Sequence, residues 1–345
     1  MWVGFAAMSP DRARTPLPPV EQVRPGLWSI PVPIPNNPLH YVLVYAFDTD
    51  RGPYLVDAGW NTDESYAALT SGLERMGSSV TDVQGVLVTH IHPDHFGLAG
   101  RIRQDSGAWV GMHPADIELF EGRYVETGPL LEAVEATLRM AGAPAEEMQA
   151  LSRASMAILP LVVPTVPDVV MEDGFKPDIP GWDVRAIWTP GHTPGHLCFV
   201  ETERRLLLSG DHVLPRITPN VSLLDEDGID PLGDFLRSLA KVAGEDVDEV
   251  LPAHEHRFVG LRDRTTALIE HHQERFDQVD RIIAGGSTTA WDIASQMHWS
   301  RPWERISGFM RRMALFEALA HLRAMEELGR LRVVGENPRR WAALD

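Results

Sequence analysis

The chain has 345 residues, of which 44% are hydrophobic and 23% are charged, and it contains 28 Gly and 27 Pro. This composition is typical of a globular protein with many turns, excludes a disordered or fibrous chain, and at this length favours two domains. The net charge of −18 opposes a general role in binding polyanions, because affinity for nucleic acid depends on Lys and Arg.

The first 24 residues are predicted to form a loose tail. No basic residues precede their short apolar patch, as they would in a signal peptide, and no uncharged apolar run in the chain approaches the ~20 residues of a membrane helix. Cys198 is the only cysteine, which excludes an internal disulfide. We therefore expect a cytoplasmic protein without a membrane segment.

The predicted elements begin with two apolar strands within residues 40–48 and 53–59, joined by a tight turn. A helix, a strand, a helix and a strand are predicted to follow over residues 62–77, 85–90, 93–107 and 108–114. Such alternation predicts an α/β fold in which sheets and helices form layers.

Residues 115–165 interrupt this alternation with two predicted helices, one around Leu138 and one around Leu151. An apolar, Met-containing insertion between core strands either adds packing or forms a lid over a site, and the sequence leaves both open. Strand-like segments return over residues 183–201, 204–213 and 249–256.

After residue 261 the hydrophobic pattern becomes helical, so the domain boundary is predicted near residue 260. The last predicted helix, within residues 313–330, carries an apolar stripe and ends at Gly329. The stripe consists of Leu315, Leu319, Leu322 and Met325.

The stretch from Val86 to Gly97 places candidate metal ligands directly after an apolar strand. These ligands are His90, His92, Asp94 and His95. Pro93 restricts the residue before it to an extended conformation and suits the first position of a helix, so side chains on both sides of it can face one space. Zinc and similar metals prefer imidazole nitrogen and carboxylate oxygen, so one short loop could serve two neighbouring metal positions.

Three further candidate ligands, His192, Asp211 and His254, stand where later apolar strands give way to loops. In a layered α/β fold such strand ends converge on one crevice. Five histidines and two aspartates in this placement predict a metal site rather than packing.

The remaining histidines are interpreted by position. Three histidines lie near a proposed ligand and are interpreted as supporting or incidental residues: His196, His212 and His256. Among them, His196 is the preferred candidate for a supporting role. His40 and His113 could line the entrance, whereas His271 and His272 are expected to face solvent. Cys198 lies in an apolar strand and is predicted to be a core residue, not a nucleophile.

These motifs resemble the metallo-β-lactamase fold superfamily over about residues 25–260. The family signature, His-x-His-x-Asp-His followed by a later His, Asp and His, is similar to "HIHPDH", "GHTPGH", "SGDH" and "PAHE" here. The resemblance implies an αββα sandwich with two metals at one edge of two facing sheets. It implies that the first metal is held by His90, His92 and His192, the second by Asp94, His95 and His254, and that Asp211 bridges them. The "LVDAG" stretch resembles the first family motif, so Asp57 would orient ligands without being one.

Residues 261–345 resemble the small winged-helix-like domain of one clade of this superfamily, which includes β-lactamase-like endoribonucleases and thioesterase-like hydrolases. An apolar run and a helix-capping Gly explain the same residues without nucleic acid. This domain is therefore expected to pack against the catalytic domain or against a second subunit, as in a homodimer.

The expected activity is hydrolysis at two zinc ions, with iron or manganese as alternatives. A hydroxide formed from metal-bound water would attack a small or medium ester, thioester or lactone, and Asp94 would orient it and move a proton. The acidic charge and the apolar insertion favour such a small-molecule substrate over nucleic acid. An endoribonuclease is the alternative, with basic pairs such as Arg311-Arg312 and Arg339-Arg340 guiding RNA.

Two other classes are disfavoured. Flavodiiron proteins of this fold replace one early histidine by a carboxylate, whereas His90, His92 and His95 are all histidine here. A binding protein that has lost catalysis is disfavoured by the complete ligand set.

Overall fold

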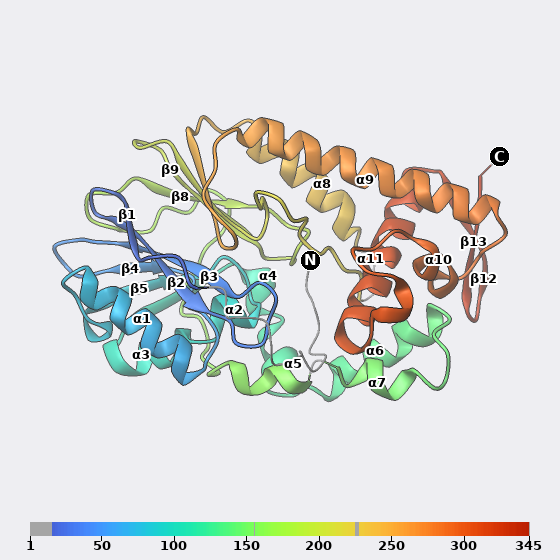
Figure 1. Ribbon diagram of the computed structural model, residues 1–345, viewed down its shortest axis with the longest axis horizontal. Coiled ribbons are helices and arrows are strands. Elements are labelled where there is room, and N and C mark those ends of the chain that lie inside the picture. The colour runs from blue at the N-terminus through green and yellow to red at the C-terminus, as the bar shows by residue number, and fades with distance from the viewer. Residues whose placement is uncertain (1–15, 155, 225–227, 345) are drawn as a thin grey trace.

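The computed structural model describes residues 16–154, 156–224 and 228–344. Two β-sheets face each other, and helices cover their outer faces (Figure 1). The predicted αββα sandwich is thus confirmed. In the described part of the chain, no helix is both long and apolar enough to cross a membrane.

The larger sheet has seven strands over the described ranges, in the same order in space as in the sequence. They are β1 (Glu21–Arg24), β2 (Leu27–Pro33), β3 (Tyr41–Phe47), β4 (Tyr54–Val56), β5 (Gly85–Leu87), β6 (Trp109–Met112) and β7 (Val169–Val170). The pairs from β1 to β4 are antiparallel, and those from β4 to β7 are parallel. Because parallel strands share one carboxyl edge, the loops after β4, β5 and β6 meet there.

The smaller sheet has four strands in the described part, in the order β11-β10-β9-β8. They are β8 (Val184–Trp188), β9 (Leu197–Glu201), β10 (Leu206–Gly210) and β11 (Glu249–Pro252). A buried cluster that includes Tyr45, Phe47, Phe199 and Leu208 fills the space between the two sheets. This apolar layer fixes the distance between the sheets and brings their loops to one edge.

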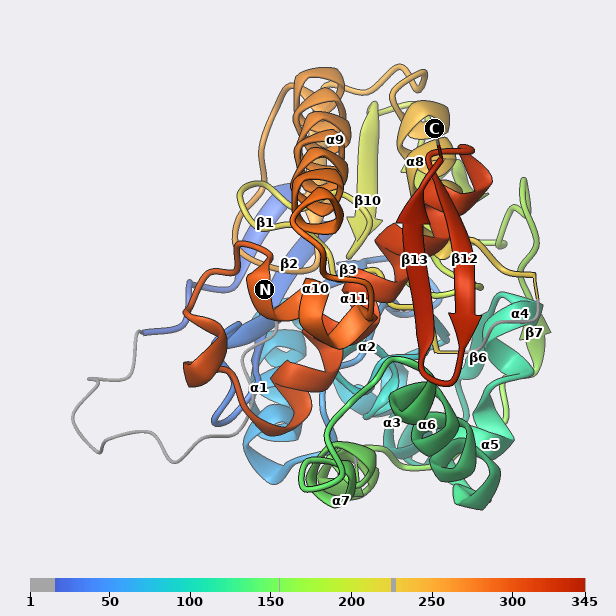
Figure 2. The same cartoon turned by 90° about the vertical axis from the view of Figure 1, so that its right-hand side faces the viewer.

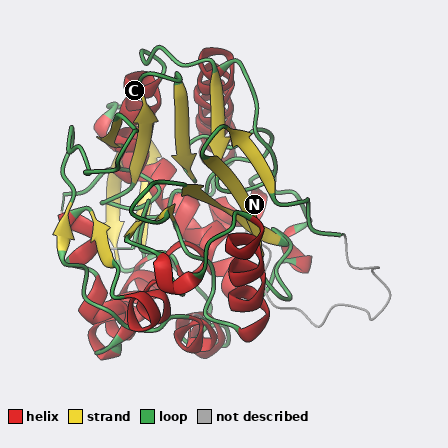
Figure 3. Cartoon of the chain, turned by 90° about the vertical axis from the view of Figure 1, so that its left-hand side faces the viewer, coloured by secondary structure: helices red, strands yellow, loops and turns green. Residues whose placement is uncertain are grey.

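Helices on the outer faces complete the sandwich (Figure 3). The larger sheet is covered by α1 (Asp63–Arg75) and α3 (Ala99–Ser106), with a short 3₁₀ helix, η1 (Val80–Asp82), between them. The smaller sheet is covered by α8 (Pro231–Val242) and α9 (Leu261–Ala284). The Thr62 side chain accepts a hydrogen bond from Ser65 N and so caps α1.

The insertion contains more helices than the two that the sequence predicts. Its described residues form α4 (Pro114–Ile117), α5 (Phe120–Tyr124), α6 (Gly128–Met140), α7 (Met148–Ser152) and η2 (Met156–Leu161). Gly128 and Pro129 begin α6, and Gly142 and Pro144 follow it, so Gly and Pro bound the longest helix of the segment. Leu138 and Leu151 are fully buried in the same hydrophobic cluster as Leu315 of the C-terminal region. These contacts favour packing over a lid.

The C-terminal region follows α9 with two further helices and a hairpin (Figure 2). The elements are α10 (Ala290–Gln296), η3 (Trp303–Arg305), α11 (Gly308–Glu327), β12 (Leu331–Glu336) and β13 (Arg339–Ala343). The predicted apolar stripe of α11 is buried, and its core is continuous with the outer face of the smaller sheet. The hairpin is absent from the sequence prediction, because two short strands of mixed polarity carry little periodic signal.

Two expectations about exposure differ from the structure. Residues 21–24 belong to the predicted tail but form β1, because Val23 is buried and Arg24 forms an ion pair with Glu249. Residues 1–15 of that tail lie outside the described residues. His272 is expected to face solvent but is 1% exposed, since it lies on the side of α9 that packs against α11.

His272 pairs with His321 of α11, with 3.1 Å between Nδ1 of the first and Nε2 of the second. His321 Nδ1 donates to Glu317 O at 2.7 Å. Burial lowers the pKa of His321 to about 3, from an ordinary value of 6.5. Below pH 6.5 the unfolded chain therefore binds a proton that the folded chain does not, so stability is present above this pH and is lost as the pH falls.

This shift predicts a specific acid sensitivity. One such histidine contributes a loss of about 2 kcal/mol between pH 7 and pH 5. His321→Gln keeps the donor to Glu317 and should reduce the pH dependence of the unfolding free energy by that amount, measured by urea denaturation. His298→Gln, at an exposed position of the same region, is the control. Equal pH dependence in the two variants would show that His321 is protonated in the folded state.

Candidate metal centre

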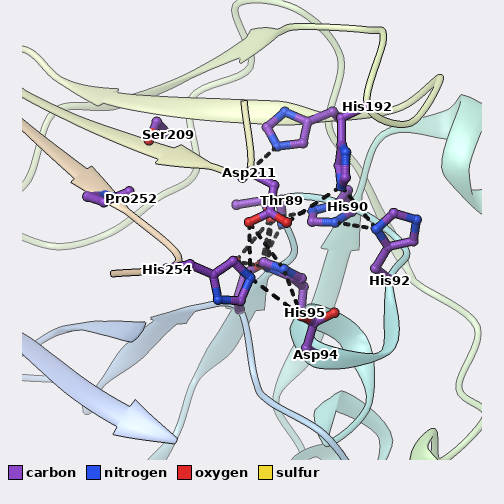
Figure 4. Close-up of polar contacts among 12 residues, drawn as sticks. Thr89, His90, His92, Asp94, His95, His192, Ser209, Asp211, Pro252 and His254 are labelled. Atoms are coloured by element: carbon purple, nitrogen blue, oxygen red, sulfur yellow. Dashed lines mark hydrogen bonds and ion pairs between the residues drawn. The ribbon is translucent and has the colours of Figure 1, made fainter. Parts of the chain in front are cut away.

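The seven proposed ligands lie together at one edge of the sandwich, each in the segment that follows a strand (Figure 4). Four come from the loop after β5, and the other three follow β8, β10 and β11. The three later residues are His192, Asp211 and His254. The structure therefore brings together residues that are up to 164 positions apart in the sequence, from His90 to His254.

The loop after β5 turns sharply at Pro93. His92 has extended backbone dihedrals, φ −65° and ψ 150°, and Pro93 begins the one-turn helix α2 (Pro93–Phe96). The histidines before the turn and the pair Asp94 and His95 after it consequently face one region. This is the arrangement that the sequence predicts for the loop.

The first group of nitrogens is formed by His90, His92 and His192. His92 Nδ1 lies 2.9 Å from His90 Nε2 and 3.0 Å from His192 Nε2. His90 and His192 are buried, whereas His92 is partly exposed. The side of this group at His92 is therefore open to solvent.

The second group is formed by Asp94, His95 and His254, all of them buried. Asp94 Oδ2 lies 3.7 Å from His95 Nε2 and 3.4 Å from His254 Nε2. Each residue offers one atom, and these atoms lie within 4.8 Å of one another. That spacing fits donors around one ion.

Asp211 lies between the two groups. Its Oδ2 is 3.5 Å from His192 Nε2, and its Oδ1 is 3.5 Å from His95 Nε2 and 3.2 Å from His254 Nε2. One carboxylate thus reaches nitrogens of both groups, each through a different oxygen. A single carboxylate in this position can bridge two ions.

Hydrogen bonds of Nδ1, on the side of each ring away from the site, fix the orientation of three of the imidazoles. Nδ1 of His95 donates to Asp57 Oδ2 at 2.7 Å, and the corresponding nitrogens of His192 and His254 donate to the carbonyls of Asn220 and Tyr41 at 2.7 and 3.0 Å. Since a carboxylate or carbonyl oxygen can only accept, Nδ1 carries the proton in each ring. Each Nε2 lone pair is therefore directed into the site.

Asp57 fills the supporting position expected for it. It is 1% exposed, has a φ of +65°, and accepts from Thr89 N at 2.8 Å as well as from the Thr89 hydroxyl at 2.9 Å. Thr89 Oγ1 lies 3.0 Å from Nδ1 of the next residue, His90. Because the hydroxyl proton is given to Asp57, its oxygen can accept from His90, whose Nε2 then also faces the site.

The donor set fits metal ions. Several buried atoms at its centre make no hydrogen bond to any described residue: both oxygens of Asp94, Oδ1 of Asp211, and Nε2 of His95 and His254. In the first group, lone pairs of His90 and His192 both point at His92 Nδ1, which could give a proton to only one of them. Buried acceptors without donors are costly unless a cation lies among them.

The pKa values of the histidines in the site also favour a bound cation. Burial lowers the pKa of His254, but the Asp211 carboxylate outweighs it and raises that pKa to about 10. Burial also opposes protonation of His95, whose pKa is nevertheless raised well above its ordinary value by the carboxylates around it, Asp211 first. Burial and the neighbouring imidazoles hold the pKa of His90 well below its ordinary value. A divalent cation would replace the protons near Asp211 and meet a neutral His90.

Asp116 is not among the predicted site residues, yet it is a fully buried carboxylate that links two ligand loops. It accepts from Ile91 N at 2.9 Å, from the Thr193 hydroxyl at 2.8 Å and from Gly195 N at 2.7 Å. A Cβ at Gly195 would lie 2.5 Å from Asp116 N, so only glycine permits this approach. The signal for Asp116 was its place just after β6, at the same sheet edge as the ligands.

Tyr124 of α5 supports the same loop. Its hydroxyl donates to Ile91 O at 2.6 Å, so both backbone groups of Ile91, between His90 and His92, are held by the insertion. Burial raises the pKa of Tyr124, and its phenol therefore stays a donor. The insertion thus contacts the site as a support.

The remaining histidines fall into different roles. His196 Nε2 accepts from Asp211 N at 3.2 Å, which places it behind the bridging carboxylate. His113 caps α4 and stacks on Trp188, with 4.9 Å between ring centroids. His212 is buried beside Phe235, whereas His40 and His256 are exposed. Burial raises the pKa of the Cys198 thiol to about 12, which leaves it a core residue.

A pocket borders the proposed ligands Asp211 and His254. Its other lining residues are Leu39, Leu214 and residues 217–220. Apolar and polar residues line it in equal number, and the apolar ones are Leu39, Leu214, Ile217 and Pro219.

Comparisons with known proteins agree with this geometry. A family model described as the metallo-beta-lactamase superfamily matches residues 37–254. The crystal structure of a metallo-beta-lactamase family protein from Thermus thermophilus is similar, with a TM-score of 0.79 and 31% identity, covering 94% of this chain and all of that one.

Two curated relatives have descriptions that name an activity. A probable metallo-hydrolase of Bacillus subtilis, YqjP, is 24% identical over 265 residues, which are 74% of this chain and 80% of that protein. An atrochrysone carboxyl ACP thioesterase of a Cryptosporiopsis species, dmxR1, is 27% identical over 159 residues, 42% of this chain and 46% of that protein.

Proposed function

We propose, since this chain belongs to the metallo-beta-lactamase superfamily, that it is a hydrolase using two zinc ions to cleave small or medium esters, thioesters or lactones. Membership in this family makes the chain a metal-dependent hydrolase. The observation that carries the two-metal proposal is Asp211, whose two oxygens lie within 3.5 Å of imidazole nitrogens from both ligand groups.

The ligand assignment is the one that the family resemblance implies. The first ion would be held by His90, His92 and His192, the second by Asp94, His95 and His254, with Asp211 in contact with both. When bound, such ions lower the pKa of a water molecule toward ~7 and polarise the substrate carbonyl. Iron or manganese would fit the same nitrogen and oxygen donors less specifically.

The chain's own residues supply orientation and proton transfer. Asp94 is buried at the second group, and its two oxygens have no hydrogen-bond donor among the described residues. It is placed to orient the attacking water and to accept its proton. As the bond from the carbonyl carbon to the sulfur or oxygen of the leaving group breaks, the same carboxyl can return that proton to the leaving group. No side-chain nucleophile is needed.

An acyl thioester is the first choice within this class. Leu39, Leu214 and Ile217 place apolar side chains beside Asp211 and His254, where the acyl chain of a thioester would pack. The relative dmxR1 is described as an ACP thioesterase, which supports the same bond type. The net charge of −18 disfavours a polyphosphate backbone.

Features of the C-terminal region argue against nucleic acid as the substrate. We infer that residues 261–345 form a winged-helix-like domain packed on the catalytic domain of residues 25–260. In such a fold α11 would be the helix that reads bases, yet its apolar stripe is buried against α8 and α7. Arg311 forms an ion pair with Glu147, and Arg339 with Glu336. The basic pairs proposed to guide RNA are therefore partly neutralised.

A hydrolysis screen tests the proposal. Purified protein supplied with zinc should cleave acyl thioesters, with aryl esters and lactones as slower substrates, and should leave single-stranded RNA intact. Efficient cleavage of RNA together with inactivity on all three carbonyl classes would refute the substrate assignment. The cytoplasmic location and the possible homodimer remain predictions.

A further inference from the structure

The loop after β10 forms one wall of the pocket without forming a helix or strand of its own. Residues 213–220, here called the pocket loop, contribute Leu214 and residues 217–220 to the pocket lining. A segment with no regular secondary structure depends on side chains to satisfy its backbone polar groups. The residues that do so determine the shape of the pocket.

Two charged side chains hold the backbone of the pocket loop. Glu255, directly after the proposed ligand His254, accepts from Arg216 N at 3.0 Å and from Ile217 N at 3.3 Å. Arg264 donates through Nε to Leu214 O at 2.6 Å and through Nη2 to Ile217 O at 2.8 Å. The guanidinium of Arg264 thus spans two carbonyls and fixes the turn between two residues that line the pocket.

The end of the pocket loop contacts a proposed metal ligand. Asn220 accepts from His192 Nδ1 through its backbone carbonyl at 2.7 Å. The Asn220 side-chain amide donates to Glu317 Oε2 at 2.8 Å, and its Oδ1 accepts from the Ser222 hydroxyl at 2.6 Å. Two successive hydrogen bonds therefore connect Glu317 with the imidazole of His192.

Both of the more distant partners belong to the C-terminal region. Arg264 lies in the first turn of α9, and Glu317 lies in α11. A backbone hydrogen bond from Leu223 N to Phe316 O, 3.1 Å long, joins the same chain segment to α11. The loop that lines the pocket is therefore held by helices outside the matched catalytic segment, residues 37–254.

We propose that α9 and α11 are working parts of the active site, with Arg264 positioning the wall of the substrate pocket and Glu317, through Asn220, positioning His192. The role of Arg264 in substrate binding rests on the proposed function. The role of Glu317 rests only on the metal-ligand assignment. A C-terminal region of this kind would determine substrate fit and metal retention instead of binding a nucleic acid.

The first test replaces Arg264. In Arg264→Met the KM for an acyl thioester should rise about 10-fold while kcat changes less than about threefold, because loss of a charged clamp loosens the pocket without touching the ligands. Arg264→Lys, which keeps the charge but reaches one carbonyl at a time, should restore part of the loss. Arg262→Met, at an exposed position of the same helix turn, is the matched control.

Hydrogen exchange gives a readout for Arg264 that needs no substrate. Amides of residues 213–220 should exchange about 10-fold faster in Arg264→Met than in Arg262→Met, with exchange in β10 and β11 unchanged. Wild-type exchange in this segment, or a fall in kcat at unchanged KM, would overturn the role of Arg264. Faster exchange in a protein that cleaves no carbonyl substrate would retain the clamp and refute the proposed function.

The second test replaces Glu317. Glu317→Leu removes the acceptor for Asn220 and should weaken binding of one of the two zinc equivalents, the one assigned to His192, about 10- to 100-fold in competition with a chelator. Glu317→Gln keeps an acceptor oxygen and should bind zinc within about threefold of wild type. Unchanged affinity in Glu317→Leu, or equal losses in the Leu and Gln variants, would overturn the positioning role.

Discussion

Replacing Asp211 by alanine should remove most of the activity and at least one of the two bound metal ions. Its carboxylate lies against imidazoles of both ligand groups, with distances of 3.2 to 3.5 Å to three Nε2 atoms. Outer hydrogen-bond partners of ligands typically contribute 10- to 100-fold to activity. A bridging ligand should contribute more, so we expect kcat/KM to fall by more than about 100-fold.

The matched control for this variant is Asp246→Ala, a surface carboxylate paired with Arg205 and 82% exposed. It should retain two metal equivalents and wild-type kcat/KM, because exposed ion pairs contribute little. Metal content is measured by elemental analysis of the purified proteins. Two equivalents of metal in Asp211→Ala, with activity near that of the control, would contradict the bridging assignment.

Replacing Asp116 by alanine should have the largest effect on stability. The carboxylate is fully buried and accepts three hydrogen bonds, two from backbone amides of the two ligand loops and one from Thr193. Truncation leaves these donors without a partner in a site from which water is excluded, at a cost of about 1 to 3 kcal/mol each. We expect the free energy of unfolding to fall by about 3 to 5 kcal/mol, measured by urea denaturation.

Metal binding should weaken in the same variant, because Asp116 holds both Ile91, between two proposed ligands, and the loop that carries His192. A 10- to 100-fold loss of zinc affinity is expected, as for other groups that support ligands. Asp178→Ala, whose side chain is 83% exposed, is the control and should match wild type in both measurements. Wild-type stability and zinc affinity in Asp116→Ala would show that the two loops are held by other contacts.

The cluster of seven proposed ligands could be predicted from the sequence because its signal is local. Four of the seven residues lie within six positions, from His90 to His95, and the other three each follow an apolar run that ends in a loop. Strand ends in layered α/β folds meet at one edge, so their sequence separation does not matter. The resemblance to a known family then assigned each residue to a metal.

Two of the supporting residues could not be found in this way. Arg264 and Glu317 are isolated charged residues in helices, where a solvent-facing role is the usual one. Their functions depend on which loop packs against each helix, and periodicity does not carry that information. The prediction for His272 is wrong for the same reason, since burial of α9 on a second side is a consequence of how α11 packs.

The insertion shows a similar limit. Its apolar residues predicted helices correctly, but Gly and Pro spacing concealed how many there were. Whether an apolar helix is a lid or a support depends on tertiary contacts. The hydrogen bonds of Tyr124 and Asp116 to Ile91 identify a support, and neither residue belongs to an apolar stripe.

The proposed reaction is hydrolysis of a carbonyl substrate by two metal ions held by these seven residues. It is tested most directly by titrating metal-free protein with zinc and measuring kcat/KM for an acyl thioester at each step. We predict that activity is absent without metal, rises with added zinc, and reaches its plateau at two equivalents per chain. Full activity in the metal-free protein, or a plateau at one equivalent that a second does not change, would contradict the claim.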